Sequence, residues 1–93
     1  MKSIIQAEKK CFFTERTDNL ENHHIYFNGT GQRKLSERYG LTVYLTHDAH
    51  NEPPNGVHFN KTRRRELERI GQTAFQEQYP ELNFIQIFGR NYL

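Results

Sequence analysis

The alternation of apolar and polar residues predicts two principal β-strands. Three apolar residues lie two positions apart between polar neighbours: Leu41, Val43 and Leu45. This period of two predicts a strand over residues 41–45. Residues 20–27 and 11–14 also look extended, and the polar run 15–19 between them is typical of a hairpin turn or a tight loop.

Helical spacing predicts three further elements. Leu35 and Tyr39 lie four residues apart and Gly40 follows, so residues 32–39 predict a short capped helix. Residues 47–51 predict a helix or turn that ends in the Pro-rich stretch 52–56.

The long helix is predicted to begin at Val57 or Asn60 and to run to about Gln78, with Pro80 just beyond it. Its expected buried stripe has helical spacing: Leu67, Ile70, Gly71, Ala74, Phe75 and Gln78. Residues 82–93 are too apolar for a free end, so we expect them to pack back on the body. No internal repeat interrupts the chain, and the prediction is one α+β domain over residues 1–93.

Composition adds a small core built largely on aromatic rings. Hydrophobic residues make up 34% of the 93 residues and aromatic residues 13%. Thirteen Lys and Arg against 11 Asp and Glu leave a formal charge of +2, which excludes a highly charged nucleic-acid tail. Nothing looks like a signal peptide or a membrane span, so the expectation is a soluble, cytoplasmic protein. The single cysteine, Cys11, forms no internal disulfide and is expected to be a small buried residue.

The five histidines are the candidates for chemistry. His23, His50 and His58 can supply three ligands to one divalent ion (Mg²⁺, Mn²⁺, Ni²⁺ or Zn²⁺), and three protein ligands with open positions define a catalytic metal site. His24, at the end of the same predicted strand as His23, would then be a general base. The alternative is a pair of partly buried, hydrogen-bonded histidines. His47 either replaces a ligand or is a solvated residue.

These residues also resemble a known family. The resemblance rests on four runs: Asn-Leu-Glu-Asn-His-His-Ile (19–25), Gly-Leu-Thr-Val-Tyr-Leu (40–45), His-Asp-Ala-His-Asn (47–51) and Val57-His58. Together they resemble the HNH (His-Asn-His) endonucleases, and in particular the small phage-borne or prophage-borne type, which would place the protein in a bacterial host cell. The resemblance implies the ββα-metal (His-Me finger) fold and metal-dependent DNA cleavage. It matches His23, His50 and His58 to metal ligands and His24 to the general base.

Two positions depart from the family pattern. The motif's middle Asn has no clear counterpart, because Leu41 falls at its place and Asn51 comes later. The two Cys-x-x-Cys pairs that hold a structural zinc in many relatives correspond here to Cys11 and Thr14, then to Thr46 and Ala49. The sequence therefore predicts that the zinc knuckle is absent.

Two basic segments are candidates for DNA contact. Arg33 and Lys34 lie between the two principal strands, where a cation can meet the scissile phosphate or its neighbour. The denser run is on the long helix: Lys61, Arg63, Arg64 and Arg65. A charge run on a helix is either a phosphate contact or a solvated face, and both interpretations stay open here.

The leading hypothesis from the sequence is a DNA endonuclease with a His general base and one divalent ion. The first alternative is an HNH-derived module that binds nucleic acid or protein without cutting. The second is a small interaction protein whose histidines hold a structural zinc with four closed ligands.

Overall fold

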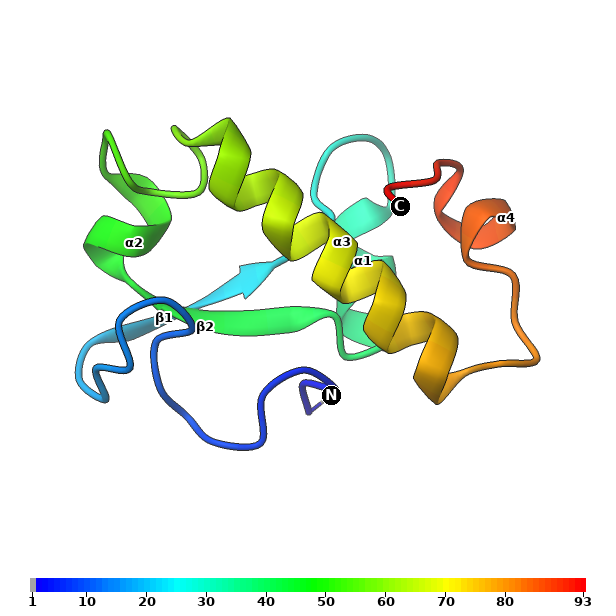
Figure 1. Ribbon diagram of the computed structural model, residues 1–93, viewed down its shortest axis with the longest axis horizontal. Coiled ribbons are helices and arrows are strands. Elements are labelled where there is room, and N and C mark those ends of the chain that lie inside the picture. The colour runs from blue at the N-terminus through cyan, green and yellow to red at the C-terminus, as the bar shows by residue number, and fades with distance from the viewer. Residues whose placement is uncertain (1) are drawn as a thin grey trace.

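Two antiparallel β-strands form the centre of the computed structural model, which describes residues 2–93 (Figure 1). Strand β1 spans Leu20–His24 and β2 spans Thr42–Thr46. The register places Leu20 opposite Thr46 and His24 opposite Thr42. The predicted strand at 41–45 is confirmed with a shift of one residue.

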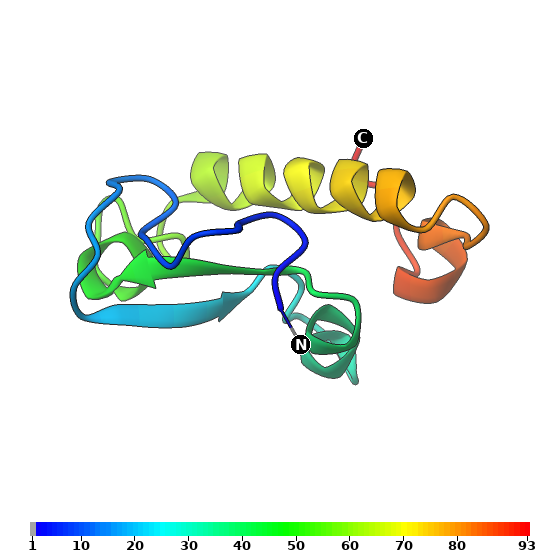
Figure 2. The ribbon, with the colours of Figure 1, turned by 90° about the horizontal axis from the view of Figure 1, so that it is seen from below.

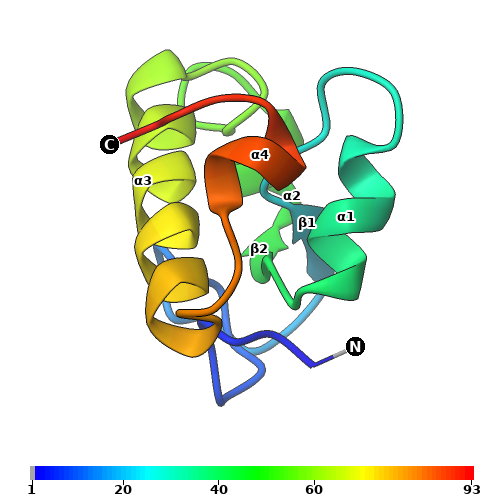
Figure 3. The same ribbon diagram turned by 90° about the vertical axis from the view of Figure 1, so that its right-hand side faces the viewer.

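Helices surround this strand pair within the described residues. Helix α1 (Gln32–Arg38) connects the strands, α2 (His47–Asn51) follows β2 directly, and α3 (Lys61–Gln78) and α4 (Phe84–Phe88) complete the chain. Figures 2 and 3 show α3 on one side of the strands and α1 on the other. Figure 1 places α2 and α4 at opposite ends of α3. The architecture is α+β, with an antiparallel strand pair and a long helix in the C-terminal half, as predicted.

The core is built largely on aromatic rings, which confirms the prediction from composition. The Phe84 and Phe88 rings stack with centroids 4.5 Å apart, and Tyr26 meets them at 5.4 and 4.9 Å. Phe75 contacts Phe84 edge-on at 5.3 Å. Such offset and edge contacts add to the hydrophobic gain from burial. The rings therefore join the end of β1 to α3 and α4.

The buried face of α3 differs from the predicted stripe. Leu67, Gly71 and Phe75 are buried as expected, whereas Ile70 and Ala74 are only half-buried and Gln78 is exposed. Two polar residues are buried in their place: Glu68 and Gln72. The helix begins after Asn60, whose side-chain oxygen accepts a hydrogen bond from the Arg63 N–H at 3.0 Å.

Gln72 is buried because it holds the C-terminal segment. Its Oε1 accepts a hydrogen bond from the Tyr92 N–H at 2.7 Å, and its Nε2 donates to Asn91 Oδ1 at 3.0 Å. The predicted return of the tail to the body is confirmed for Phe84 and Phe88, which are buried. Ile85 and Leu93 remain exposed.

The prediction of extended structure over residues 11–14 is wrong. Cys11 donates its N–H to the Arg16 carbonyl at 2.7 Å, and its carbonyl accepts from Glu15 N–H at 2.8 Å, so local bonds close a turn. Glu15 takes the left-handed φ of 63° that such a turn requires. The first strand also ends at His24 rather than at Phe27, because the chain bends there toward α1. No helix in residues 2–93 combines the length and apolarity of a membrane span.

Gly71 tests the packing between α3 and the ring cluster. A Cβ at Gly71 would lie 2.7 Å from the Tyr26 hydroxyl oxygen, which donates a hydrogen bond to the Glu68 carbonyl at 2.6 Å. Helix propensity alone would make Gly71→Ala stabilising by about 1 kcal/mol. We expect destabilisation by about 1–3 kcal/mol in urea unfolding instead, because the core would be overpacked. The loss should shrink in a Tyr26→Phe background, and a more stable Gly71→Ala protein would contradict this packing.

Candidate metal centre

Three histidines from separate elements meet at the end of β1. His23 comes from β1, His50 from α2 and His58 from the loop between α2 and α3. One ring nitrogen of each lies within 4.8 Å of one ring nitrogen of the others. The structure thus brings together the three residues that the sequence predicted as ligands.

Local backbone bonds hold the His58 loop against α2. Val57 donates its N–H to the Ala49 carbonyl at 2.9 Å, and His58 donates to the His50 carbonyl at 3.3 Å. Since α2 begins at the residue after β2, His50 lies within one helical turn of the end of that strand. Short connections on both sides of α2 therefore bring His50 and His58 close together.

His23 is the buried member of the cluster. It is 2% exposed, and its Nε2 is a buried polar atom without a hydrogen-bond partner among residues 2–93. Burial lowers the pKa of His23 to about 3, and the neighbouring His50 and His58 act in the same direction. A buried polar atom without a partner costs about 1–3 kcal/mol, so a neutral imidazole in this position is suited to a ligand.

His50 and His58 complete the nitrogen set. Their Nε2 atoms lie 3.0 Å apart, and two nitrogens that bind one ion at about 2 Å are themselves separated by roughly 3 Å. Burial also lowers the pKa of His58, and the charges of His50 and Arg64 act in the same direction. Phe27 forms an apolar wall against the His58 ring at a centroid distance of 4.7 Å.

Glu21 orients the cluster, and the sequence interpretation missed it. Its Oε1 accepts a hydrogen bond from His50 Nδ1 at 2.9 Å, which directs the unprotonated His50 Nε2 toward the other two histidines. Its Oε2 contacts Nδ1 of His47 at 2.9 Å, and these two bonds lower the pKa of Glu21. His47 therefore lies outside the three-histidine cluster. The available signal was spacing, since Glu21 precedes His23 by two residues and shares its strand face.

His24 lies on the opposite strand face but borders the same cavity. That cavity has a volume of about 340 Å³ and is lined by residues of β1, α1, α2 and two loops: Asn22, His23, His24, Phe27, Arg33, His50 and His58. Nε2 of His24 contacts Oε2 of Glu37 at 2.9 Å, a second carboxylate that sequence reasoning missed. An imidazole outside the cluster therefore borders the same space as the three-nitrogen set.

The basic residues predicted to bind DNA have different surroundings. Arg33 lines the cavity, and Lys34 is its exposed neighbour on α1. Arg64 lies close enough to His58 for its charge to lower the pKa of that imidazole. Arg33 and Arg64 therefore put positive charge beside the histidines.

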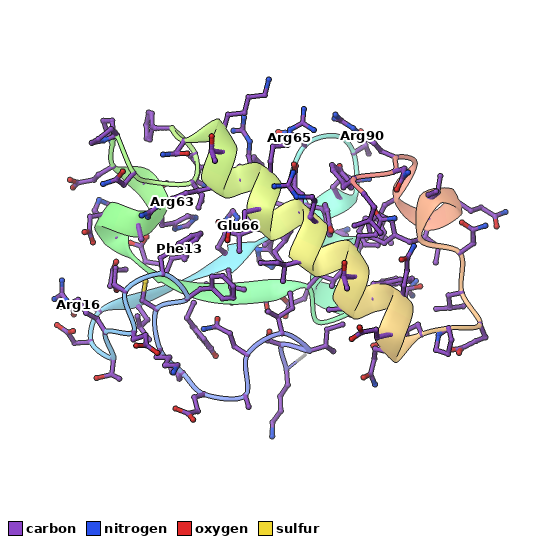
Figure 4. The ribbon with its side chains drawn as sticks, viewed as in Figure 1. Phe13, Arg16, Arg63, Arg65, Glu66 and Arg90 are labelled. Atoms are coloured by element: carbon purple, nitrogen blue, oxygen red, sulfur yellow. The ribbon has the colours of Figure 1, made fainter. Side chains whose placement is uncertain are left out.

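The other three basic residues are arranged differently. Arg63 lies over the Phe13 ring at 4.6 Å and donates to the Asn55 carbonyl at 3.4 Å (Figure 4). Arg65 Nε lies 3.8 Å from Glu68 Oε1, and Lys61 is exposed at the first residue of α3. Arg63 thus has a packing role on the side of α3 that faces Phe13.

Cys11 and Thr46, two of the positions that the family resemblance aligns with a zinc knuckle, are in contact. Sγ of Cys11 is 3.7 Å from the Thr46 hydroxyl and accepts a hydrogen bond from the Thr46 N–H at 3.4 Å. Burial raises the pKa of the Cys11 thiol, but hydrogen bonds from Thr14, Thr46 and Phe13 outweigh this effect and bring it to about 7. A buried Cys-Thr contact thus stands where the resemblance places a zinc.

No protein-family model, curated protein or solved structure matches this chain. Function must therefore rest on the chemistry of the histidine site.

The depressed pKa of His23 predicts a pH-dependent stability of the metal-free protein. Between about pH 6.5 and pH 3 the unfolded chain protonates His23 and the folded chain does not, so acid favours unfolding. In a chelator, the free energy of unfolding should fall by up to about 1.4 kcal/mol for each pH unit below 6.5. Urea unfolding of the wild type and of His23→Gln measures this slope.

The His23→Gln profile should be flatter than that of the wild type. His47→Gln is the control, because Glu21 raises the pKa of His47 and stabilises the folded state at low pH instead. Removing His47 should therefore leave the acid-induced loss in place. Parallel wild-type and His23→Gln profiles would contradict the burial argument.

Proposed function

We propose that this chain is a metal-dependent endonuclease of the HNH (ββα-metal) type that hydrolyses phosphodiester bonds in DNA. The observation that carries the proposal is the shared cavity. A three-histidine cluster, the separate imidazole of His24 and the guanidinium of Arg33 all border it. Phosphodiester hydrolysis uses a Lewis acid, a base for water and a cation for the phosphate, and these groups can provide all three.

The histidine cluster fits a divalent ion. His23 Nε2 is buried without a partner among residues 2–93, and Glu21 fixes the orientation of His50. A structural zinc usually has four closed ligands, whereas three histidines group in the described part of the chain and border an open cavity. An all-imidazole set favours Zn²⁺ or Ni²⁺ over Mg²⁺. An ion held there would polarise the scissile phosphate and stabilise the charge on the leaving oxygen.

The chain's own residues then divide the remaining work. His24 takes a proton from water. The oxygen of the resulting hydroxide forms a bond to phosphorus while the bond from phosphorus to the 3′ oxygen breaks. The departing 3′ oxygen takes a proton from solvent, which leaves a 3′-hydroxyl and a 5′-phosphate. Arg33 binds the phosphate that enters the cavity.

The arrangement of elements supports the family resemblance. A strand with the His-His pair is followed by an antiparallel strand and then directly by the helix that carries His50. The contact between Cys11 and Thr46 lies where the family resemblance places a structural zinc. Both placements are expected of a ββα-metal core that has replaced its zinc knuckle with packing.

One observation favours the non-cutting alternative. Leu41, at the place of the motif's middle Asn, is completely buried. Asn51 donates to Glu21 Oε1 at 3.2 Å and so belongs to the metal side of the site. A module that binds DNA and metal without cutting would share this geometry, and a cleavage assay separates the two.

The decisive experiment separates the base from the ligands. Plasmid nicking with Mg²⁺, Mn²⁺, Ni²⁺ and Zn²⁺ should show cleavage by the wild type. His24→Ala should lose about 10²- to 10⁴-fold in rate but keep its metal affinity, because it removes a base and not a ligand. His50→Ala and His58→Ala should weaken metal binding, measured by calorimetry, and lower the melting temperature of the metal-loaded protein.

His47→Ala is the matched histidine control and should retain most of the metal affinity, since His47 lies outside the cluster. Loss of the ion in His24→Ala with retention in His23→Ala would reverse the two roles. A wild type that binds the ion but cuts no DNA with any of the four metals would support the binding module instead.

The surroundings of the basic residues predict different effects on DNA binding. Arg33→Gln and Lys34→Gln should weaken binding to all sequences alike, and removing one phosphate-binding cation should reduce the salt slope by about 1. Arg63→Gln should lower stability with little change in that slope, because its guanidinium lies over Phe13. Binding titrations over a range of salt concentrations measure both effects. An unchanged salt slope in Arg33→Gln and Lys34→Gln would indicate that this segment is solvated surface and not a phosphate contact.

A further inference from the structure

We infer that Glu37 is a positioning residue for His24, holding the imidazole in the tautomer and orientation that a general base needs. The inference rests on the proposed nuclease function. His24 Nε2 and Glu37 Oε2 lie 2.9 Å apart. The His24 side chain is 19% exposed and that of Glu37 48%, so the contact lies at the rim of the site, within reach of water and substrate.

The chemistry of this contact determines which ring nitrogen is the base. An ionised carboxylate only accepts hydrogen bonds, so Nε2 of His24 carries the proton and donates it to Glu37. The neutral ring then has its lone pair on Nδ1, which is the nitrogen left to take a proton from water. Without Glu37 the ring would distribute between two tautomers and several orientations.

Helix α1 is fixed against the end of β1, and this makes Glu37 a defined partner. The residue before it, Ser36, is completely buried. Its hydroxyl donates to the Tyr26 carbonyl at 2.8 Å and accepts from the Tyr26 N–H at 3.0 Å. The Ser36 carbonyl accepts the Leu41 N–H at 2.8 Å. The backbone of Glu37 is therefore tied to the chain just after His24 and just before β2.

Glu37 also has a role once His24 has taken up a proton. When Nδ1 takes a proton from water, the water O–H bond breaks and the imidazole becomes a cation. The Glu37 carboxylate stabilises this cation at 2.9 Å and does not itself take the proton.

In this assignment one carboxylate orients a metal ligand and a second orients the general base. Glu21 holds the ligand His50 through Nδ1, and Glu37 holds the base His24 through Nε2. The two acids lie on different elements, β1 and α1. Removing the Glu21 carboxylate should therefore affect metal binding, and removing the Glu37 carboxylate should affect the chemical step.

Kinetics and NMR test this assignment in the full chain loaded with Zn²⁺. Glu37→Ala should lower kcat by about 10- to 100-fold with KM and metal affinity nearly unchanged. Glu37→Gln should recover part of the loss, because its amide oxygen can accept the same hydrogen bond. In a His24→Ala background, Glu37→Ala should cost little more, since it acts through that ring. Glu77→Gln is the charge-matched control, because Glu77 lines a different cavity with Ile4 and Ile5.

The NMR measurement does not depend on activity. At about pH 8 the ¹⁵N shifts of His24 should show a proton on Nε2 in the wild type and in Glu77→Gln, and a tautomer mixture in Glu37→Ala.

An unchanged tautomer or an unchanged kcat in Glu37→Ala would overturn the inference. The inference would also be overturned if Glu37→Ala lowered kcat by the same factor in the wild type and in the His24→Ala background. A wild type that cuts no DNA would overturn the proposed function and the base role of His24, while the NMR comparison would still decide whether Glu37 holds the ring.

Discussion

Burial of a neutral imidazole at the end of β1 is the constraint on which the site depends. His23 lies on β1 with its ring against His50 of α2 and His58, and its buried Nε2 has no partner within residues 2–93. A proton on this nitrogen is disfavoured, and in the proposed function a bound ion becomes its partner. The contacts that bring His50 and His58 to His23 then define the three-histidine side of the cavity.

The pleat of β1 separates the three-histidine cluster from His24, the base in the proposed function. His23 shares its face with Glu21, whereas His24 points to the other face and meets Glu37 from α1. Because both histidines lie at the end of an edge strand, one cavity can border both faces. Two adjacent residues can thus have different roles without competing for one position.

The rest of the fold supports this end of the strand pair with few apolar residues. Two aromatic rings of α4 pack against Tyr26, which follows His24 by two residues along the chain, and Phe75 of α3 contacts one of them, Phe84. Gln72 ties the C-terminal segment to α3, and Ser36 ties α1 to Tyr26. These buried hydrogen bonds connect distant segments in a chain whose single cysteine cannot form an internal disulfide.

The elements with strong local signals and the set of three histidines could be predicted from the amino-acid sequence. Period and capping predicted α1, β2 and most of α3, because these signals depend on neighbours along the chain. The contacts of Glu21 and Glu37 with the histidines became evident only in the folded chain. The burial of the polar Gln72 and the exposure of Gln78 also became evident only there. These features depend on which distant segments meet in space, and no local pattern of hydrophobic and polar residues encodes that meeting.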